Sequence, residues 1–557
     1  MAKDYKRYTV TTALPYANGP IHIGHIAGSF LPADIYVRYL RSKKKDVIFI
    51  GGSDEHGVPV TIRAQKEGIS PQEIVDKYHT MNKKDLEDFG ISLDIFSRTS
   101  NETHKVNASS FFTKLYNDEK LIVNESEQYY DNEVKQFLAD RYIRGVCPIC
   151  KYDDAYGDQC EKCGSTLSPN ELIEPRSALS GAKPILRKTT HWYLPLKKYE
   201  QWLKKWILEE HTEWKVNVYG QCKSWLDNGL LDRPITRDLQ WGVPVPLNEA
   251  NGKVLYVWFE APIGYISATQ ELCKQTDRNW ELYWKNDDTK LVHFVGKDNI
   301  VFHCIVFPVM LKAHGGFILP DNVPANEFMN LEGNKISTSR NYAIWLHDYL
   351  LEYTDKQDVL RYVLCANMPE TKDSDFTMSD FKSRNNNELV AILGNFVNRT
   401  VSLIHKCHSG IVPEVVELTP TDIALFASVN DLIKRIEDSI NTYHFRDALQ
   451  YWMDIARAGN KYISDEEPWH AINSNPERVK TVLNVCIHLV AKLAIVGEPF
   501  VPFTSKKLFL MLDIHDQLWD MSYKNDIIRG GVSVDNVGIL FDKIQDLHFA
   551  NTYLTKM

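Results

Sequence analysis

The pattern of hydrophobic and polar positions divides the chain into an alternating part and a helical part. In the alternating part, helix-like spacing follows each of the short apolar runs at residues 8–13, 47–50 and 291–295. Beyond about residue 380 the pattern is almost wholly helical, with amphipathic segments at residues 385–405, 421–443, 445–463 and 476–495. This order predicts an α/β domain with a doubly wound parallel (Rossmann-like) sheet, followed by an all-α helical bundle.

One proline conflicts with the helical pattern after the first strand. Pro32 falls inside the apolar periodicity that begins at Ile23. Because proline has no N–H and its ring crowds the preceding turn, the helix after His25 is predicted either to be short or to bend after Leu31.

A region without strand–helix regularity interrupts the α/β part from about residue 116 to residue 232. We therefore expect five regions along the chain. They are residues 1–115, the first half of the Rossmann-like domain; 116–233, an insertion; 234–322, the second half; 323–384, a linking region; and 385–557, the helical domain.

The insertion contains two Cys-x-x-Cys pairs, Cys147/Cys150 and Cys160/Cys163. Two such knuckles offer four thiolates to a tetrahedral site, which suits Zn²⁺ and leaves no open position for catalysis. The alternative is a pair of disulfides. The other six cysteines are scattered through apolar segments, which is typical of a reducing compartment and favours a structural metal.

Bulk properties exclude several classes of protein. At 557 residues the chain is too long for one core. We expect no membrane segment, because no apolar run approaches the roughly 18–20 residues of a span. We also expect no signal or transit peptide, which makes the cytoplasm the default location. The net charge of −9 argues against non-specific coating of nucleic acid, although a local basic surface can still bind RNA.

The first candidate site is the stretch TTALPYANGPIHIGH at residues 11–25. It places His22, Gly24 and His25 at a junction between a strand and a helix, where backbone N–H groups and the helix dipole attract phosphate. The two imidazoles can donate hydrogen bonds to phosphate, and Gly24 leaves room for a flat base. Taken alone, a His-x-x-His spacing is more often an ordinary turn.

Later strand ends, including that of a predicted strand at residues 254–258, carry further polar or aromatic groups. Asp54 is suited to neutralise an ammonium group, although an aspartate there also suits a helix cap. Trp258, Ala261, Pro262 and Tyr265 predict a narrow apolar slot that fits a thioether, with an ordinary aromatic core as the alternative. His303, one turn into the next helix, either completes this pocket or is a buried histidine with a backbone partner.

Residues 328–334 are predicted to form a hairpin-like turn, which ends in a small, polar and basic loop at residues 335–340, reading KISTSR. A lysine ammonium and serine hydroxyls in a mobile loop can stabilise charge on a departing pyrophosphate. The alternative is a solvated loop without a role in catalysis.

These motifs occur in an order that resembles class I aminoacyl-tRNA synthetases, and PYANG followed by HIGH is similar to the methionyl members. The element YVWFEAPIGY at residues 256–265 closely matches one in the same enzymes. KISTSR resembles the second class signature, usually Lys-Met-Ser-Lys-Ser, but Thr338 replaces its second lysine. We therefore hypothesise that Lys335, helped by Arg340, carries the electrostatic role.

The resemblance implies that ATP and L-methionine form methionyl-adenylate, from which the methionyl group passes to tRNA(Met), and that Mg²⁺ accompanies ATP. It implies catalytic roles for His22, His25 and Lys335, and ATP binding by these three with Gly24, Ser337, Ser339 and Arg340. It implies a methionine site built from Ala13, Leu14, Tyr16, Asp54, Trp258, Ala261, Pro262, Tyr265 and His303. It also implies a metal-bearing connective insertion and an anticodon-binding bundle that uses Asn395, Arg399 and Trp469.

Two alternatives remain at this point. A synthetase for valine, isoleucine or leucine usually carries a large editing insertion, whereas the insertion before Thr236 is small and cysteine-bearing. A non-catalytic RNA-binding relative is supported only by Thr338. No appended dimerisation domain is visible in the sequence, so we expect a monomer.

Overall fold

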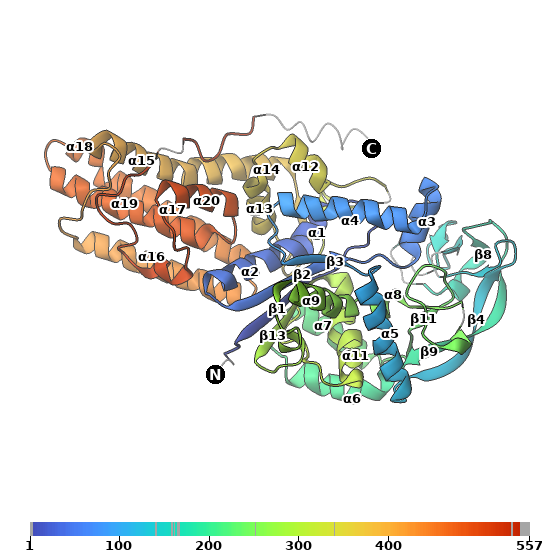
Figure 1. The fold of residues 1–557 in the computed structure, drawn as a ribbon. Coiled ribbons are helices and arrows are strands. Elements are labelled where there is room, and N and C mark those ends of the chain that lie inside the picture. The colour runs from blue at the N-terminus through green and yellow to red at the C-terminus, as the bar shows by residue number, and fades with distance from the viewer. Residues whose placement is uncertain are drawn as a thin grey trace.

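The computed structural model describes residues 4–139, 142–157, 160, 162–163, 167–250, 252–338, 340–535 and 538–545 (Figure 1). At its centre lies a five-stranded sheet in the order β14-β13-β1-β2-β3, with every neighbouring pair parallel. Its strands are β1 (Arg7–Thr12), β2 (Asp46–Ser53), β3 (Ile95–Arg98), β13 (Thr289–Gly296) and β14 (Ala325–Asn326). The order reverses at β1, and ligands of such sheets bind at the carboxyl ends of the strands beside the reversal.

Helices cover both faces of this sheet because its side chains alternate between two cores. On β2, Phe49 joins the core beneath α2 (Leu31–Ser42), and Ile48 and Ile50 join the core beneath α9 (Ile263–Thr276). Further helices of this part include α3 (Val58–Glu67), α4 (Pro71–Asp88), α5 (Glu102–Asn117), α10 (Glu281–Trp284) and α11 (Phe307–His314), with the short turn η7 (Lys297–Asn299).

The helix that starts at the first candidate site is long. It runs through α1 (Ile23–His25), the π-helical η1 (Ile26–Phe30) and α2, so the predicted short helix is wrong. The π turn pairs the N–H of Leu31 with the carbonyl of Ile26, and Pro32 then occupies the first turn of α2, where no donor is needed. The same arrangement recurs after β13, where η8 (Phe302–Val306) precedes α11 and its Pro308.

The insertion consists of two small antiparallel sheets, ordered β10-β9-β4-β5 and β7-β6-β8. Its strands are β4 (Ile122–Asp131), β5 (Gln136–Phe137), β6 (Ile143–Val146), β7 (Ala155–Tyr156), β8 (Ile173–Ser177), β9 (Ile185–Leu194) and β10 (Arg233–Pro234). Its helices are η3 (Pro169–Glu171), η4 (Leu196–Tyr199), α6 (Glu200–Leu203), η5 (Lys204–Glu209) and α7 (Val216–Asp227). The strands β4, β8 and β9 of the insertion lie at the right of Figure 1, and its helix α6 lies at the bottom.

The stretch around Trp258 differs from its strand-like sequence. Only β12 (Val254–Leu255) is a strand, paired with β11 (Thr236–Arg237) and preceded by η6 (Asn248–Ala250). Trp258 instead lies in the short helix α8 (Val257–Glu260). The aromatic and β-branched residues favour a strand locally, and tertiary packing overrides that preference.

The linking region carries the second loop on a small sheet, ordered β16-β15-β17. Its elements are β15 (Met329–Leu331), β16 (Asn334–Lys335), β17 (Ser374–Phe376), α12 (Leu346–Glu352), α13 (Gln357–Ala366) and α14 (Met378–Arg384). The predicted hairpin turn is confirmed: Glu332 and Gly333 both have positive φ, as a tight two-residue hairpin requires.

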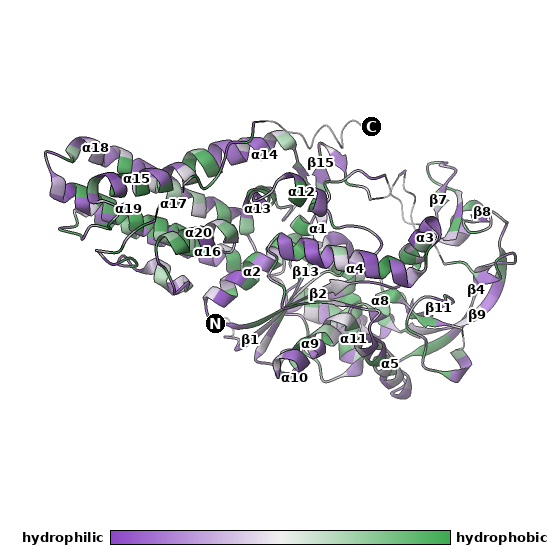
Figure 2. Cartoon of the chain, turned by 45° about the horizontal axis from the view of Figure 1, so that its top comes forward, coloured by the Kyte–Doolittle hydropathy of each residue, from purple (hydrophilic) through white to green (hydrophobic). Residues whose placement is uncertain are grey.

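The C-terminal part is a helical bundle, as the periodicity predicts (Figure 2). Its elements are η9 (Asn385–Gly394), α15 (Asn395–His408), α16 (Pro420–Asn441), α17 (Phe445–Glu466), α18 (Pro468–Ala471), α19 (Pro476–Gly497), α20 (Pro502–Met511) and η10 (Trp519–Tyr523). One hydrophobic core continues from beneath α2 through the linking region into this bundle.

The expectation that no apolar run has the length of a membrane span is wrong for α19. This helix is long and apolar enough by composition, but 94% of its most apolar window is buried among the other helices. Figure 2 shows the hydrophobic residues of α17 and α19 inside the bundle. The apolar character of α19 therefore reflects its place in a protein core.

Candidate active site

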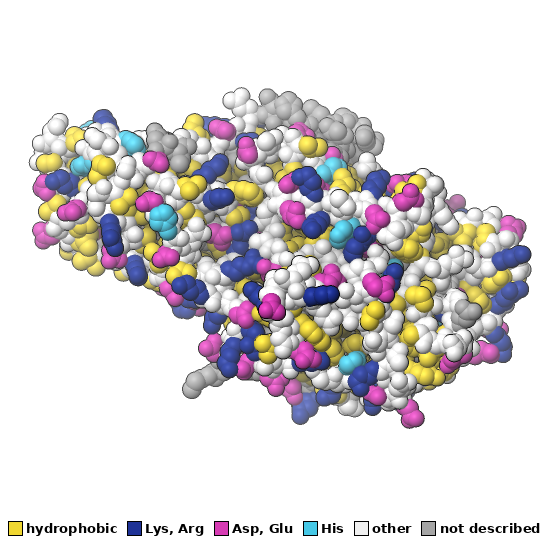
Figure 3. All heavy atoms as spheres, viewed as in Figure 1, with side chains coloured by type: hydrophobic (Ala, Val, Ile, Leu, Met, Phe, Trp, Pro, Cys, Tyr) yellow, Lys and Arg dark blue, Asp and Glu magenta, His cyan; other side chains and the backbone are white. Residues whose placement is uncertain are grey.

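A cleft of about 940 Å³ lies at the carboxyl ends of the central strands. It is lined by segments that are distant in the sequence, among them Tyr16, His25, His56, Trp258 and Trp345. The predicted histidine loop, the end of β2, the aromatic stretch and the region after the second loop therefore share one cavity. Figure 3 shows acidic and basic side chains interspersed over one face of the molecule.

His22 and His25 form a stacked pair at the start of α1, with ring centroids 3.8 Å apart. The Gly24 N–H donates to His22 Nδ1 at 3.1 Å, and the His22 N–H donates to His25 Nδ1 at 3.2 Å. Since both Nδ1 atoms accept, each neutral ring carries its proton on Nε2. The backbone thus fixes the tautomer that makes each ring a hydrogen-bond donor.

Burial keeps this pair uncharged. It lowers the pKa of His22 well below its usual range, and the neighbouring His25 lowers the pKa further. Burial also lowers the pKa of His25 to about 4. Both rings are therefore neutral donors near pH 7, a state that suits hydrogen bonding to a phosphate oxygen without a permanent ion pair.

Gly24 lies between the His22 ring and Ile336 of the second loop. A Cβ at this position would lie 3.0 Å from the His22 ring and 3.5 Å from the Cδ1 of Ile336. The absence of a side chain therefore lets the His22 ring fold back over the helix start, while Ile336 of the second loop lies at ordinary contact distance. The predicted room for a base at Gly24 stays a prediction.

The segment after the second loop is hydrogen-bonded to the first. The Ile23 N–H donates to the Ile344 carbonyl at 3.1 Å, and the Leu346 N–H donates to the Ile21 carbonyl at 2.9 Å. The Trp345 ring lies 5.8 Å from that of His22. Sequence reasoning missed Trp345, because its position follows from this long-range pairing.

The second loop itself is a tight turn whose ends, Ser337 and Tyr342, exchange two hydrogen bonds of 2.9 Å. Lys335 is exposed on β16, with its Nζ 5.3 Å from the centre of the Phe328 ring. Arg340 is exposed, and Thr338 lines the cleft. The predicted Ser339 lies outside the described residues.

Tyr265 and His303, two residues of the predicted amino-acid pocket, are buried and hydrogen-bonded to each other. The His303 Nδ1–H donates to the Asn299 carbonyl at 3.0 Å, so its Nε2 accepts from the Tyr265 hydroxyl at 2.9 Å. Burial lowers the pKa of His303 to about 4 and raises the pKa of Tyr265, so both groups are neutral. The pair is therefore an uncharged, hydrogen-bonded unit among buried apolar residues.

Trp258, also predicted for this pocket, lines the cleft together with Tyr16. The indole N–H of Trp258 donates to the Tyr16 hydroxyl at 3.0 Å, and its ring contacts Phe302 edge-on, with centroids 4.7 Å apart. Of the other predicted pocket residues, Ala13 follows β1 and its N–H bonds the Phe294 carbonyl. Leu14 lies beside Gly264 of α9, and Ala261 and Pro262 lie at the start of the same helix.

Asp54 follows β2 and is only 6% exposed. Its backbone holds the first loop, because its N–H bonds the Pro15 carbonyl and its carbonyl accepts from the Ala17 N–H, both at 2.8 Å. Within the described residues, its Oδ1 is buried without a hydrogen-bond partner. Burial, reinforced by the negative charge of Glu260, raises the pKa of the Asp54 carboxyl well above its usual range.

Glu260 belongs to a buried network that sequence reasoning missed. It accepts hydrogen bonds from His56 at 2.8 Å and from His104, and all three side chains are buried. Despite its burial, the neighbouring His56 and His104 lower the pKa of Glu260. Its sequence signal was a single acid in the otherwise apolar stretch at residues 254–265.

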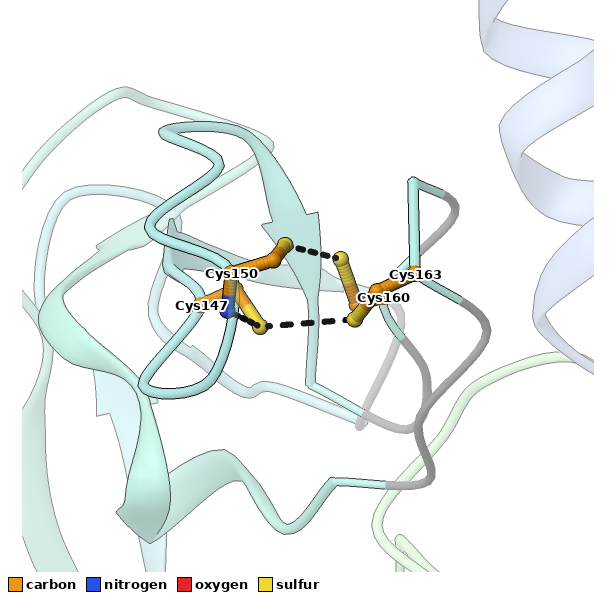
Figure 4. Close-up of side chains that lie close together, drawn as sticks. All are labelled: Cys147, Cys150, Cys160 and Cys163. Carbon is orange, nitrogen blue, oxygen red and sulfur yellow. Dashed lines mark hydrogen bonds between the residues drawn. The ribbon is translucent and has the colours of Figure 1, made fainter.

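The four cysteines of the insertion come together as predicted (Figure 4). Their sulfur atoms lie within 4.8 Å of one another, with 3.9 Å between Cys147 and Cys163 and 3.6 Å between Cys150 and Cys160. Tetrahedral Zn²⁺ with bonds of about 2.3 Å separates its sulfur ligands by about 3.8 Å, whereas a disulfide needs about 2.05 Å. The donor set and its spacing therefore fit a four-coordinate metal.

The three predicted anticodon residues form one cluster on the bundle. The Arg399 guanidinium lies 5.1 Å from the centre of the Trp469 ring and donates to the Ser464 hydroxyl at 3.2 Å. One turn earlier on α15, Asn395 bonds Asn460 of α17 at 3.2 Å. A partly exposed indole beside a guanidinium is a surface on which an unstacked base can stack.

Comparison with known proteins identifies the family of both parts of the chain. Residues 8–401 match the family model of class I tRNA synthetases (M), and residues 412–555 match that of the anticodon-binding domain of methionyl tRNA ligase. Methionine–tRNA ligases of Cytophaga hutchinsonii and Bacteroides fragilis are each 60% identical, over 98% of this chain and 80% of their own length.

A solved structure shares the fold. It is the methionyl-tRNA synthetase of Mycobacterium tuberculosis bound by methionyl-adenylate, with a TM-score of 0.80 at 23% identity over 96% of this chain and all of that one. The family models and the curated relatives together cover both the α/β part and the bundle. The chain therefore belongs to the methionyl family of class I tRNA synthetases.

Proposed function

We propose that this chain is a methionine–tRNA ligase, which joins methionine and ATP to give methionyl-adenylate and pyrophosphate and then transfers the methionyl group to the 3′-terminal adenosine of tRNA(Met). The observation that carries the proposal is the neutral His22/His25 pair at a helix start, whose His25 lines one cleft together with Trp258 and Tyr16. The relatives of 60% identity support the same activity.

In the first step the carboxylate of methionine attacks the α-phosphorus of ATP and pyrophosphate leaves. The Nε2–H groups of His22 and His25 donate to the phosphate oxygens on which charge develops. Lys335 and Arg340 stabilise the departing pyrophosphate, and ATP brings Mg²⁺ with its phosphates. No protein nucleophile is needed, so catalysis consists of positioning and electrostatics.

Methionine selectivity rests on the buried pocket. Tyr265 and His303 meet the thioether with an uncharged hydroxyl and ring, since sulfur accepts only weak hydrogen bonds and packs well against aromatic edges. The Trp258 ring closes the outer side, and the ionised Asp54 holds the ammonium group. A branched side chain without sulfur would fill this slot less well.

An ATP–pyrophosphate exchange assay over methionine, valine, isoleucine and leucine tests the proposal. Exchange that depends on methionine, followed by charging of tRNA(Met), is the expected result. Preferred exchange with another amino acid would assign a different synthetase, and silence with all four would favour a non-catalytic RNA-binding relative.

We propose that the four cysteines hold one structural Zn²⁺, which stabilises an insertion with a small core of its own.

Elemental analysis is expected to find about one zinc per chain. Cys150→Ser is expected to lose the metal and to expose the insertion to limited proteolysis. Cys407→Ser, a half-buried bundle cysteine outside the cluster, is the control and should keep both the metal and the protease resistance. Full zinc content in Cys150→Ser would contradict the assignment.

Methionine binding is expected to release a proton at pH values below the raised pKa of Asp54. Burial and Glu260 favour the protonated carboxyl in the free protein, whereas the bound ammonium favours the carboxylate. The Kd for methionine should therefore rise as pH falls. The released proton binds to the buffer, and phosphate and Tris differ in their enthalpy of protonation. Calorimetry in the two buffers should therefore give different apparent enthalpies of methionine binding, and Asp54→Asn should abolish that difference. Equal enthalpies in both buffers, or proton uptake, would contradict the role of Asp54.

Trp469→Ala is expected to lower kcat/KM for charging of tRNA(Met) by about 10–100-fold, because stacking on one base is worth roughly 1–3 kcal/mol. Amino-acid activation should not change, since Trp469 lies in the bundle and not in the cleft. Exchange and charging assays on the same preparation separate the two effects. His470→Ala alters the exposed neighbour and serves as the control.

We further propose a cytoplasmic monomer. The described cysteines include no disulfide, which agrees with a reducing compartment. Light scattering on the purified protein tests the oligomeric state.

A further inference from the structure

One buried polar residue on α4 occupies a position where the helical pattern calls for an apolar side chain. Ile74, Tyr78 and Leu86 lie on the buried face of this helix at intervals of four or eight residues, and Asn82 occupies the missing place in that series. Asn82 is 0% exposed. Such a departure from the local pattern points to a specific partner.

That partner is the backbone of the first signature loop. The Ile21 N–H donates to Asn82 Oδ1 at 3.1 Å, and Asn82 Nδ2 donates to the Gly19 carbonyl at 3.2 Å. The fixed polarity of the two backbone groups leaves one orientation for the amide. Between them lies Pro20, which has no N–H of its own, so the side chain of Asn82 joins the two sides of a turn.

The two hydrogen bonds that Asn82 makes to Gly19 and Ile21, the Asn82 clamp, complete a set of hydrogen bonds around His22. Asn82 holds the N–H of Ile21, Leu346 bonds the carbonyl of Ile21, and Ile344 accepts from the N–H of Ile23. The N–H of His22 itself bonds the ring of His25. The peptide that carries the first catalytic histidine is therefore fixed from α4 on one side and from the segment after the second loop on the other.

We infer that Asn82 is a positioning residue for amino-acid activation: its amide clamps the turn at Gly19 and Ile21 and thereby aims His22 at the α-phosphate. This inference rests on the proposed function. Asparagine suits the position because it both accepts and donates at this length, whereas aspartate only accepts when ionised and leucine does neither. A displacement of about 1 Å in a catalytic group can cost about 100-fold in rate.

Asn82→Leu tests the inference, because leucine fits the apolar face of α4 and removes both hydrogen bonds. We expect kcat for ATP–pyrophosphate exchange to fall by about 10–100-fold. The KM for methionine should change by less than about threefold, because Tyr265 and His303 are held by contacts that do not involve α4. Asn82→Ala, with methionine binding measured by calorimetry, provides the same test if the leucine variant does not fold.

Asn484→Leu is the matched control. Asn484 is a buried asparagine on α19 that donates to the Pro413 carbonyl at 2.7 Å within the bundle. Its loss should lower the thermal stability to a similar extent and leave the exchange rate unchanged. A similar loss of exchange in both variants would show that Asn82 has only a structural role.

A double-mutant cycle separates positioning from other effects. If Asn82 acts through His22, Asn82→Leu should cost at most about threefold in a protein that already carries His22→Asn. Fully additive losses, or an unchanged rate in Asn82→Leu alone, would overturn the inference while methionine-dependent exchange by the unaltered protein still stands. Absence of that exchange would overturn the proposed function and the inference with it.

Discussion

Lys335→Ala is expected to slow methionyl-adenylate formation by about 100–1000-fold, the usual cost of removing one group that stabilises transition-state charge. Lys335 is exposed on β16 immediately before Ile336, whose side chain approaches Gly24 of the first loop. Its ammonium can therefore reach pyrophosphate as that group leaves, and the position of the usual second lysine is occupied by Thr338. Methionine affinity should change little, because the amino-acid pocket is formed by other elements.

Exchange kinetics with calorimetric methionine binding on the same variant measure both quantities. Arg340→Ala should show a smaller loss, because it assists Lys335, and Thr338→Lys should restore part of the rate in the Lys335→Ala background. Lys524→Ala, an exposed lysine of the bundle, is the control. Exchange close to that of the unaltered protein in Lys335→Ala would contradict the role assigned to this loop.

His22→Asn is expected to lower the exchange rate by about 100–1000-fold, because it removes a donor that is fixed in place before the reaction begins. With Thr338 uncharged, the histidine pair carries a larger share of the phosphate stabilisation, so the loss should be at the upper end of that range. His515→Asn, an exposed histidine near Asp513, should have no effect. If His22→Asn lowers the exchange rate no more than the same substitution does in a relative with both loop lysines, the histidine pair does not carry a larger share of the phosphate stabilisation.

The same assignment predicts the pH dependence of the unaltered protein. Burial depresses the pKa of His22 and sets that of His25 at about 4, so both rings are already neutral at pH 6. Titration of this pair should therefore not change the activation rate between about pH 6 and pH 8. A rate that falls across this range and loses that dependence in His22→Asn would show that the charged imidazolium is the active form.

Features that depend only on residues close together in the chain could be predicted from the sequence. The helices of the bundle follow from their 3.6-residue periodicity, and the metal cluster follows from two short knuckles whose cysteines are three residues apart. The turn at Glu332 and Gly333 was predictable for the same reason. The order of the class I motifs also identified the family, because each motif is a local string of residues.

Which of these sequence segments lie together, and which secondary structure they adopt, depends on the tertiary fold. The parallel sheet places β1 beside β2 and β13, and this brings His25, His56 and Trp258 into one cleft. Long-range packing converted the strand-like stretch around Trp258 into a helix. It also carried the helix past Pro32 by means of a π turn, a hydrogen-bond pattern that local periodicity does not specify.

The chemistry of the site depends on the same long-range contacts. The neutral state of His22 and the raised pKa of Asp54 follow from burial, which a sequence pattern does not measure. The Asn82 clamp and the Glu260 network join residues between 61 and 204 positions apart in the chain. Local sequence thus supplied the reactive groups, and the packing of distant segments determined their protonation, orientation and partners.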